Sequence, residues 1–160
     1  MNSGTAKQRK CYPINSITLK LPKIVTQNIL GFHALTGCDS TSSFTGHGKK
    51  TCWKVYQKHP ELLSGVGRDG SMEKAEEFVS LLYDSPFPSE GVDKARYVMF
   101  LKGKKTLEML PPTKDALELH VIRANYQAKV WLQATTSIMD MGSPFDTNGW
   151  IKGENGLSIN

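Results

Sequence analysis

One long helical stretch, residues 113–135, most constrains what this chain can fold into. Its larger apolar residues step along the sequence by four, three, four and three positions, which is the spacing of one face of an α-helix. They are Leu117, Val121, Ala124, Ala128 and Trp131. Thr113 stands where a helix N-cap is expected, directly after two prolines. A helix with one apolar seam is stable only when that seam is buried, so the stretch predicts a bundle of helices.

Other parts of the sequence agree with a mainly α fold of a single domain. Residues 22–38, 49–59, 71–83 and 92–101 carry apolar side chains at helical spacing between proline-rich or glycine-rich breaks. Residues 12–21 alternate apolar and polar side chains, which predicts a short N-terminal β element. We expect four regions along the chain: a basic lead-in with the β arm (1–18), a helix–turn–helix unit (19–66), a small helical bundle (67–141) and an irregular tail (142–160).

The composition argues against an exported or membrane protein. No stretch has the length and apolar content of a membrane span, and residues 1–10 are polar and basic without the apolar run of an export signal. The three cysteines form no C-x-x-C pair, and their odd number is typical of reduced thiols. We therefore expect an intracellular protein, nuclear or cytoplasmic, with no membrane partner.

The charge of the chain is unevenly distributed. Residues 1–60 contain nine Lys or Arg against a single acid, Asp39, whereas residues 61–160 contain eleven bases against fourteen acids. A basic segment of this kind typically binds a polyanion, because each phosphate that it neutralises releases counterions. The alternative is a solvated basic face beside an acidic partner.

A glycine-containing turn lies in the centre of the basic segment. Gly46 and Gly48 let a ligand approach the backbone closely, and the helix that follows offers free amide N–H groups at its positive end. Lys49 and Lys50 occupy the first helical turn, where cations are unfavourable unless an anion offsets them. Lys50 and Lys54 belong to a lysine stripe with four-residue spacing. These five residues predict a nucleic-acid site that contacts phosphates without reading bases.

Residues 30–63 resemble the flap endonuclease and PIN-like nuclease group. The resemblance lies in a Gly-Cys-Asp step that ends an apolar helix, a G-x-G-x-K turn seven residues later, and a helix that closes near Lys-His. The matching residues are Gly37, Asp39, Gly46, Gly48, Lys50, Lys58 and His59, and Lys49 departs from the usual proline. The resemblance implies that Asp39 binds a catalytic divalent metal, Mg²⁺ or Mn²⁺. It also implies that the glycine turn holds a duplex backbone through a monovalent cation.

A wider resemblance, over about residues 5–155, is to uncharacterised animal proteins associated with mobile elements. It rests on residues 33–39, on residues 110–113 and on the set Arg123, Tyr126, Gln127 and Trp131. It implies an upstream or separate acidic nuclease half that would complete the site. Two-metal hydrolysis needs several clustered carboxylates, and Asp39 is the only acid before Glu61. We therefore expect the isolated chain to be inactive as a nuclease.

Other interpretations of the same residues remain open. Asp39 also suits a turn or an N-cap without any metal. The spacing between His33 and Cys38, repeated between His47 and Cys52, is five residues, which does not fit the closer pairs of structural zinc sites. The main alternative function is an all-helical protein-interaction module. The two functions differ in that only nucleic-acid binding predicts duplex affinity that falls steeply with salt.

Overall fold

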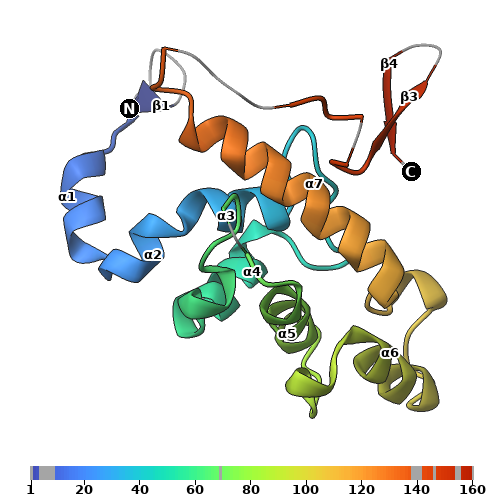
Figure 1. Ribbon diagram of the computed structural model, residues 1–160. Coiled ribbons are helices and arrows are strands. Elements are labelled where there is room, and N and C mark those ends of the chain that lie inside the picture. Colours follow the sequence, from blue (N-terminus) through green and yellow to red (C-terminus); the bar gives the residue numbers. More distant parts are fainter. Residues whose placement is uncertain are drawn as a thin grey trace.

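Helices dominate the computed structural model of the chain, which describes residues 2–3, 10–68, 70–137, 142–145, 147–153 and 156–159 (Figure 1). The α-helices in this part are α1 (Ile14–Lys20), α2 (Lys23–Gln27), α3 (Ile29–Leu35), α4 (Lys49–Lys58), α5 (Met72–Leu82), α6 (Val92–Leu101) and α7 (Lys114–Leu132). Short 3-10 turns lie at Pro60–Leu63, Pro88–Glu90 and Leu107–Met109. The predicted mainly α fold is confirmed. None of the helices in the described ranges is long and apolar enough to cross a membrane.

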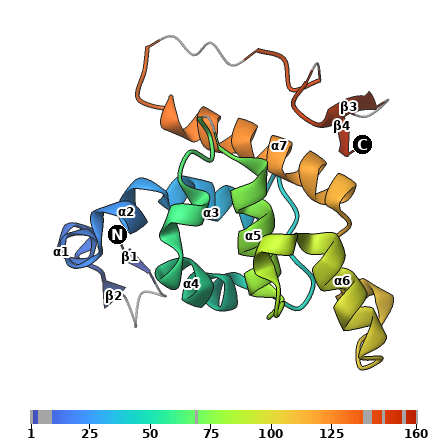
Figure 2. The same cartoon turned by 60° about the horizontal axis from the view of Figure 1, so that its bottom comes forward.

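Helix α7 runs across α3, and this crossing organises the core (Figures 1 and 2). The seam predicted from the sequence faces inward, with Leu117, Val121, Ala124 and Ala128 buried. A hydrogen bond joins the two helices, because His120 Nε2 lies 2.7 Å from the carbonyl oxygen of Leu35. The side chain of Thr113 accepts a hydrogen bond from the amide of Ala116, so it caps α7 as predicted.

A break at Asn28 divides the helix that the sequence predicted over residues 22–38. The side-chain amide of Asn28 donates to the carbonyl oxygen of Pro60 at 3.3 Å and to the hydroxyl of Ser64 at 3.0 Å. These contacts tie the junction of α2 and α3 to the segment that follows α4. The helix ends near Gly37, whose φ of 100° is one that glycine adopts without strain.

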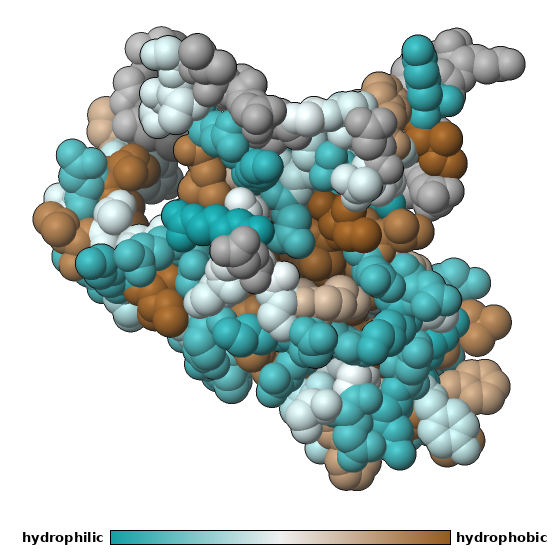
Figure 3. Space-filling view, in the orientation of Figure 1, coloured by the Kyte–Doolittle hydropathy of each residue, from teal (hydrophilic) through white to brown (hydrophobic). Residues whose placement is uncertain are grey.

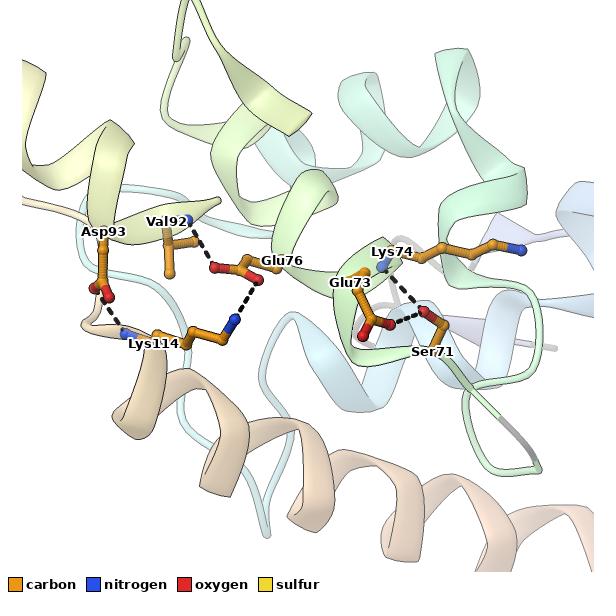
Figure 4. Close-up of polar contacts among 7 residues, drawn as sticks. All are labelled: Ser71, Glu73, Lys74, Glu76, Val92, Asp93 and Lys114. Atoms are coloured by element: carbon orange, nitrogen blue, oxygen red, sulfur yellow. Dashed lines mark hydrogen bonds and ion pairs between the residues drawn. The ribbon is translucent and has the colours of Figure 1, made fainter. Parts of the chain in front are cut away.

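A cluster of charged side chains joins the starts of α6 and α7 to α5 (Figure 4). The buried carboxylate of Glu76, on α5, accepts a hydrogen bond of 3.1 Å from the amide of Val92 and pairs with the amine of Lys114 at 3.6 Å. Asp93 accepts from the backbone amide of Lys114 at 3.0 Å. Both acids therefore lie at helix N-termini, where a negative charge is stabilising. A Cβ at Gly91 would overlap the Glu76 carboxylate, so glycine is required there.

The prediction of an N-terminal β arm over residues 12–21 is wrong. This segment contains α1, and the N-terminal β pairing is limited to β1 (Asn2–Ser3) with β2 (Lys10–Cys11). The four-residue strands lie at the other end of the chain, where β3 (Trp150–Gly153) pairs antiparallel with β4 (Gly156–Ile159). The tail from residue 142 is thus not wholly irregular. Most of the predicted basic lead-in, residues 4–9, lies outside the described residues.

Candidate nucleic-acid interface

Helix α4 separates an apolar face from a basic face. Cys52 and Tyr56 are buried, and the ring of Tyr56 stacks on Phe32 with the ring centroids 4.7 Å apart. The phenol of Tyr56 donates to the carbonyl oxygen of Val25 at 2.7 Å, and burial raises its pKa. These contacts fix the rotation of α4 about its axis. The side chains on its other face are therefore held toward solvent.

Three lysines form a ridge along that exposed face: Lys50, Lys54 and Lys58. They are spaced four residues apart, so they lie nearly above one another on the helix. The helix contains no Asp or Glu, and no ion pair found among the described residues includes a ridge lysine. We call these three residues the lysine ridge. Its positive charge is not neutralised within the helix.

The glycine turn lies at the N-terminal end of the lysine ridge. The amide of His47 donates to the carbonyl oxygen of Phe44 at 3.0 Å, which closes a tight turn. Gly46 has a φ of 78°, as the third residue of a type II turn requires. A Cβ at Gly46 or Gly48 would meet no atom within 4 Å. The backbone of the turn is therefore open to approach, and no side chain caps the N-terminus of α4.

Lys49 differs from its neighbour Lys50 in what its amine contacts. The Nζ atom of Lys49 donates to the carbonyl oxygen of His33 at 2.6 Å and to the hydroxyl of Thr36 at 2.7 Å. It also lies 5.4 Å from the centre of the Phe32 ring. The lysine thus reaches the negative C-terminal end of α3, where a cation is favourable. Burial lowers the pKa of Lys49. This contact explains a cation in the first turn of α4 without an external anion.

A pocket of about 360 Å³ lies beside the lysine ridge, between α4 and the end of α5. Lys54 and Lys58 line it together with His47, and Asp84 is the one acid in its wall. Burial lowers the pKa of His47, and the nearby charge of Lys105 adds to this effect although Asp84 opposes it. The imidazole is therefore uncharged at neutral pH, and the positive charge of this pocket comes from lysine.

The structure adds a second group of lysines that the sequence analysis missed. Lys102, Lys104 and Lys105 follow α6 and line a neighbouring pocket that shares Asp84 with the first. All three are exposed. The run Lys-Gly-Lys-Lys is a visible signal in the sequence, but only the fold brings it close to the glycine turn. The basic surface thus extends from α4 toward the end of α6.

Asp39 is exposed at the tip of a turn that Cys38 and Thr41 close by a β-bridge. No cluster of three or more His, Cys, Asp or Glu that could hold a metal occurs among the described residues. The histidines and cysteines considered for zinc thus form no such cluster among the described residues. The ring of His33 instead stacks on Trp131, with the ring centroids 5.2 Å apart. Asp69 and Asp146, two other acids of the chain, lie outside the described residues.

A search for similar proteins found no matching family model, no matching curated protein and no matching solved structure. The function is therefore inferred from the geometry of the chain.

Proposed function

We propose that this chain binds the phosphate backbone of duplex or structured nucleic acid through the lysine ridge and the glycine turn. The observation that carries the proposal is a row of three exposed lysines on a helix without acids, beginning at a turn whose backbone is open. Lysines without internal partners attract phosphates and release counterions on binding. Of the residues that the sequence predicted, Gly46, Gly48, Lys50 and Lys54 make the contacts, whereas the amine of Lys49 is engaged by the end of α3.

The dimensions of the ridge fit a nucleic-acid strand. Eight residues separate Lys50 from Lys58, so the two Cα atoms are roughly 12 Å apart along the helix axis. Phosphates of one DNA strand rise by about 3.4 Å each along the duplex axis and also wind around it, so a ridge of this length can reach only a few of them. Lysine amines contact phosphates as point charges and read no bases. Binding is therefore selective for shape rather than for sequence.

We further propose that the protein is a partial nuclease-like domain that is inactive by itself. Asp39 is its candidate ligand for Mg²⁺ or Mn²⁺, and the glycine turn is its candidate site for a monovalent cation. One exposed carboxylate with water makes a weak octahedral site, so catalysis requires further carboxylates from an upstream or separate acidic half. Duplex cleavage by the purified chain in Mg²⁺, lost in Asp39→Asn, would contradict this part of the proposal.

The test of binding is a salt series with the double variant Lys50→Ala/Lys54→Ala. Fluorescence anisotropy with a labelled duplex gives the affinity at each salt concentration. We expect weaker binding, and a slope of log affinity against log salt that is smaller by about one for each phosphate that the variant no longer neutralises. The control Lys74→Ala/Lys94→Ala removes two charges outside α4 and should keep the wild-type slope. Equal slopes for both double variants would overturn the proposal.

The alternative function, a helical protein-interaction module, is favoured by one separate observation. Large apolar side chains are exposed on and after α6: Tyr97 and Phe100 are each 59% exposed and Leu101 is 64% exposed. Figure 3 shows apolar side chains standing out from the surface at the α6 end of the molecule. Exposed apolar patches commonly mark interaction sites. Duplex binding that is absent at low salt would favour this alternative.

A further inference from the structure

A cavity of about 350 Å³ lies between the loop that follows α3 and one face of α7, away from the lysine ridge. The loop contributes Ser42, Ser43 and Phe44, and α7 contributes Leu119, His120 and Arg123. We call this cavity the Arg123 pocket. None of the residues that the sequence predicted for nucleic-acid binding lines it. Its volume falls in the range of small-molecule sites.

Arg123 carries the only formal positive charge in the wall of this pocket, and it is buried. Its residue exposure is 5%, and its Nε atom has no hydrogen-bond partner. One terminal nitrogen, Nη1, donates to the carbonyl oxygen of Gly149 at 3.1 Å. The ion pairs found among the described residues do not include Arg123. A buried guanidinium is costly unless an anion lies beside it.

The side chain of Arg123 is held in place by the segment before β3. A Cβ at Gly149 would lie 3.0 Å from the Cγ atom of Arg123, so the backbone of Gly149 packs directly on the arginine stem. This contact and the hydrogen bond from Nη1 to the Gly149 carbonyl oxygen both restrict the movement of the side chain. A charge that is fixed in this way is pre-organised for a ligand.

The remaining wall of the pocket combines hydroxyl groups with apolar surface. Ser42 and Ser43 are exposed at its edge and offer hydroxyl donors. Phe44 is 8% exposed and packs edge-on against His120, with the ring centroids 5.2 Å apart. Burial lowers the pKa of His120, although the carbonyl oxygen of Leu35 opposes this, so the imidazole adds no charge at neutral pH. Phe44 and Leu119 provide the apolar side.

We propose that the Arg123 pocket binds the oxyanion group of a small ligand that also carries an apolar body. The guanidinium and the two serine hydroxyls face the oxyanion, since planar guanidinium donors match phosphate and carboxylate oxygens. Phe44 and Leu119 contact the apolar body. The Arg123 pocket shares no lining residue with the pocket beside the lysine ridge, and Phe44, which also closes the glycine turn, is the link between the two sites.

The test is isothermal titration calorimetry of the whole chain with phenyl phosphate, inorganic phosphate and benzoate. We expect phenyl phosphate to bind more tightly than inorganic phosphate because only the former fills the apolar side. Benzoate carries the same ring on a carboxylate, so its affinity relative to phenyl phosphate separates the two kinds of oxyanion. Arg123→Gln should weaken binding about tenfold or more, as loss of a charge-assisted pair does. The matched control Arg68→Gln removes an exposed arginine outside the pocket and should bind as the wild type does.

A second variant keeps the test valid if Arg123→Gln fails to fold. Ala116→Trp places a large side chain in the pocket wall at an exposed helix position, and Glu118→Trp places the same side chain on α7 outside the wall. We expect Ala116→Trp to abolish binding and Glu118→Trp to retain it. Absence of binding by both aromatic oxyanions to the wild type, or equal binding by the two tryptophan variants, would overturn the proposal. Duplex binding and its salt slope should be unchanged in Ala116→Trp, which separates this site from the lysine ridge.

Discussion

Two regions of this molecule are rich in charge, and they differ in what those charges contact. At the junction of α5, α6 and α7, Glu76 and Asp93 both meet the amide or amine of a following helix (Figure 4). On α4, no lysine of the ridge takes part in an ion pair found among the described residues. Charges of the first kind hold helices together, whereas charges of the second kind are available to a partner. Pairing therefore separates the charges that hold helices together from those that are left for the proposed nucleic-acid contact.

Two adjacent residues at the start of α4 show the same difference between a charge with contacts inside the protein and a charge that faces solvent. Lys49 reaches back to the end of α3 and is partly buried, whereas Lys50 points to solvent. Identical side chains one position apart thus have different surroundings, and only Lys50 belongs to the surface for which we propose nucleic-acid binding. Their orientations follow from the helical rotation of about 100° between neighbouring residues.

The strongest test of this comparison is Glu76→Ala, at the paired junction. The change leaves the buried amide of Val92 without its acceptor and Lys114 without its partner. We expect a loss of about 2–3 kcal/mol in the free energy of unfolding, measured by urea denaturation. Duplex affinity should stay unchanged under conditions where the variant is folded.

Two further variants at the junction show which part of the carboxylate matters. Glu76→Gln keeps an oxygen that can accept from Val92, so it should lose less stability than Glu76→Ala. Glu77→Ala alters the neighbouring acid on the same helix and should lose little. A loss in Glu77→Ala as large as that in Glu76→Ala would show that general charge, not the contact with α6, stabilises the junction.

An intermediate effect on stability is expected when the amine of Lys49 is removed, and the matched change at Lys50 should affect binding instead. Lys49→Met removes the amine from the end of α3 and should destabilise the protein by about 1–2 kcal/mol in urea denaturation. Lys50→Ala should leave the free energy of unfolding nearly unchanged and weaken duplex binding. If duplex binding is abolished in Lys49→Met and retained in Lys50→Ala, the phosphate contact belongs to Lys49 and our proposal names the wrong lysine.

The smallest expected effect is a dependence of the free energy of unfolding on pH, caused by His120 where α7 meets α3. Burial lowers the pKa of His120 below its usual value, and the charge of Arg123 adds to this although the Leu35 carbonyl opposes it. The unfolded chain then binds more protons than the folded one as the pH falls through about 6.5, so the stability that the neutral imidazole contributes is lost on acidification. Urea denaturation at pH 7.5 and pH 5.5, taken as rough limits of that window, should show this loss.

The variant His120→Gln isolates that contribution from those of the other histidines. Its side-chain amide can still donate to Leu35, but it does not titrate. We expect a shallower dependence of stability on pH than in the wild type, whereas identical slopes would show that other groups, such as His33 and His47, cause the effect.

The helices that the sequence predicted well are those with local signals at both ends. Thr113 and Ser71 are N-caps that accept from backbone amides three residues on, and both were visible as helix starts. The break at Asn28 was not predictable, because it depends on Pro60 and Ser64 far along the chain. The contact of Lys49 with α3 was missed for the same reason. Local rules place helices, but long-range contacts decide how they break and which lysine is exposed.

The two ends of the chain were misjudged for different reasons. Ile14, Ile17 and Leu21 fit helical spacing, whereas Ile17, Leu19 and Leu21 fit alternation, so a segment this short was ambiguous, and α1 buries none of its residues. The C-terminal hairpin, which pairs Gly153 with Gly156, was not predicted because the Gly-, Ser- and Asn-rich composition of the tail favoured an irregular segment. The glycine turn was predicted in position. What surrounds it, including Lys105 and Asp84, required the fold.

The crossing of α3 by α7 has a consequence for synthesis of the chain. The core around Leu35 closes only when His120 and the buried seam of α7 reach it, and these residues follow about 85 positions later. On the ribosome, we therefore expect the surface of α3 around Leu35 to stay uncovered until α7 is made, whereas Phe32 and Tyr56 can already pack on each other. During that interval the uncovered surface is open to chaperones or to another nascent copy, and the time needed to synthesise the chain through α7 sets how long the exposure lasts.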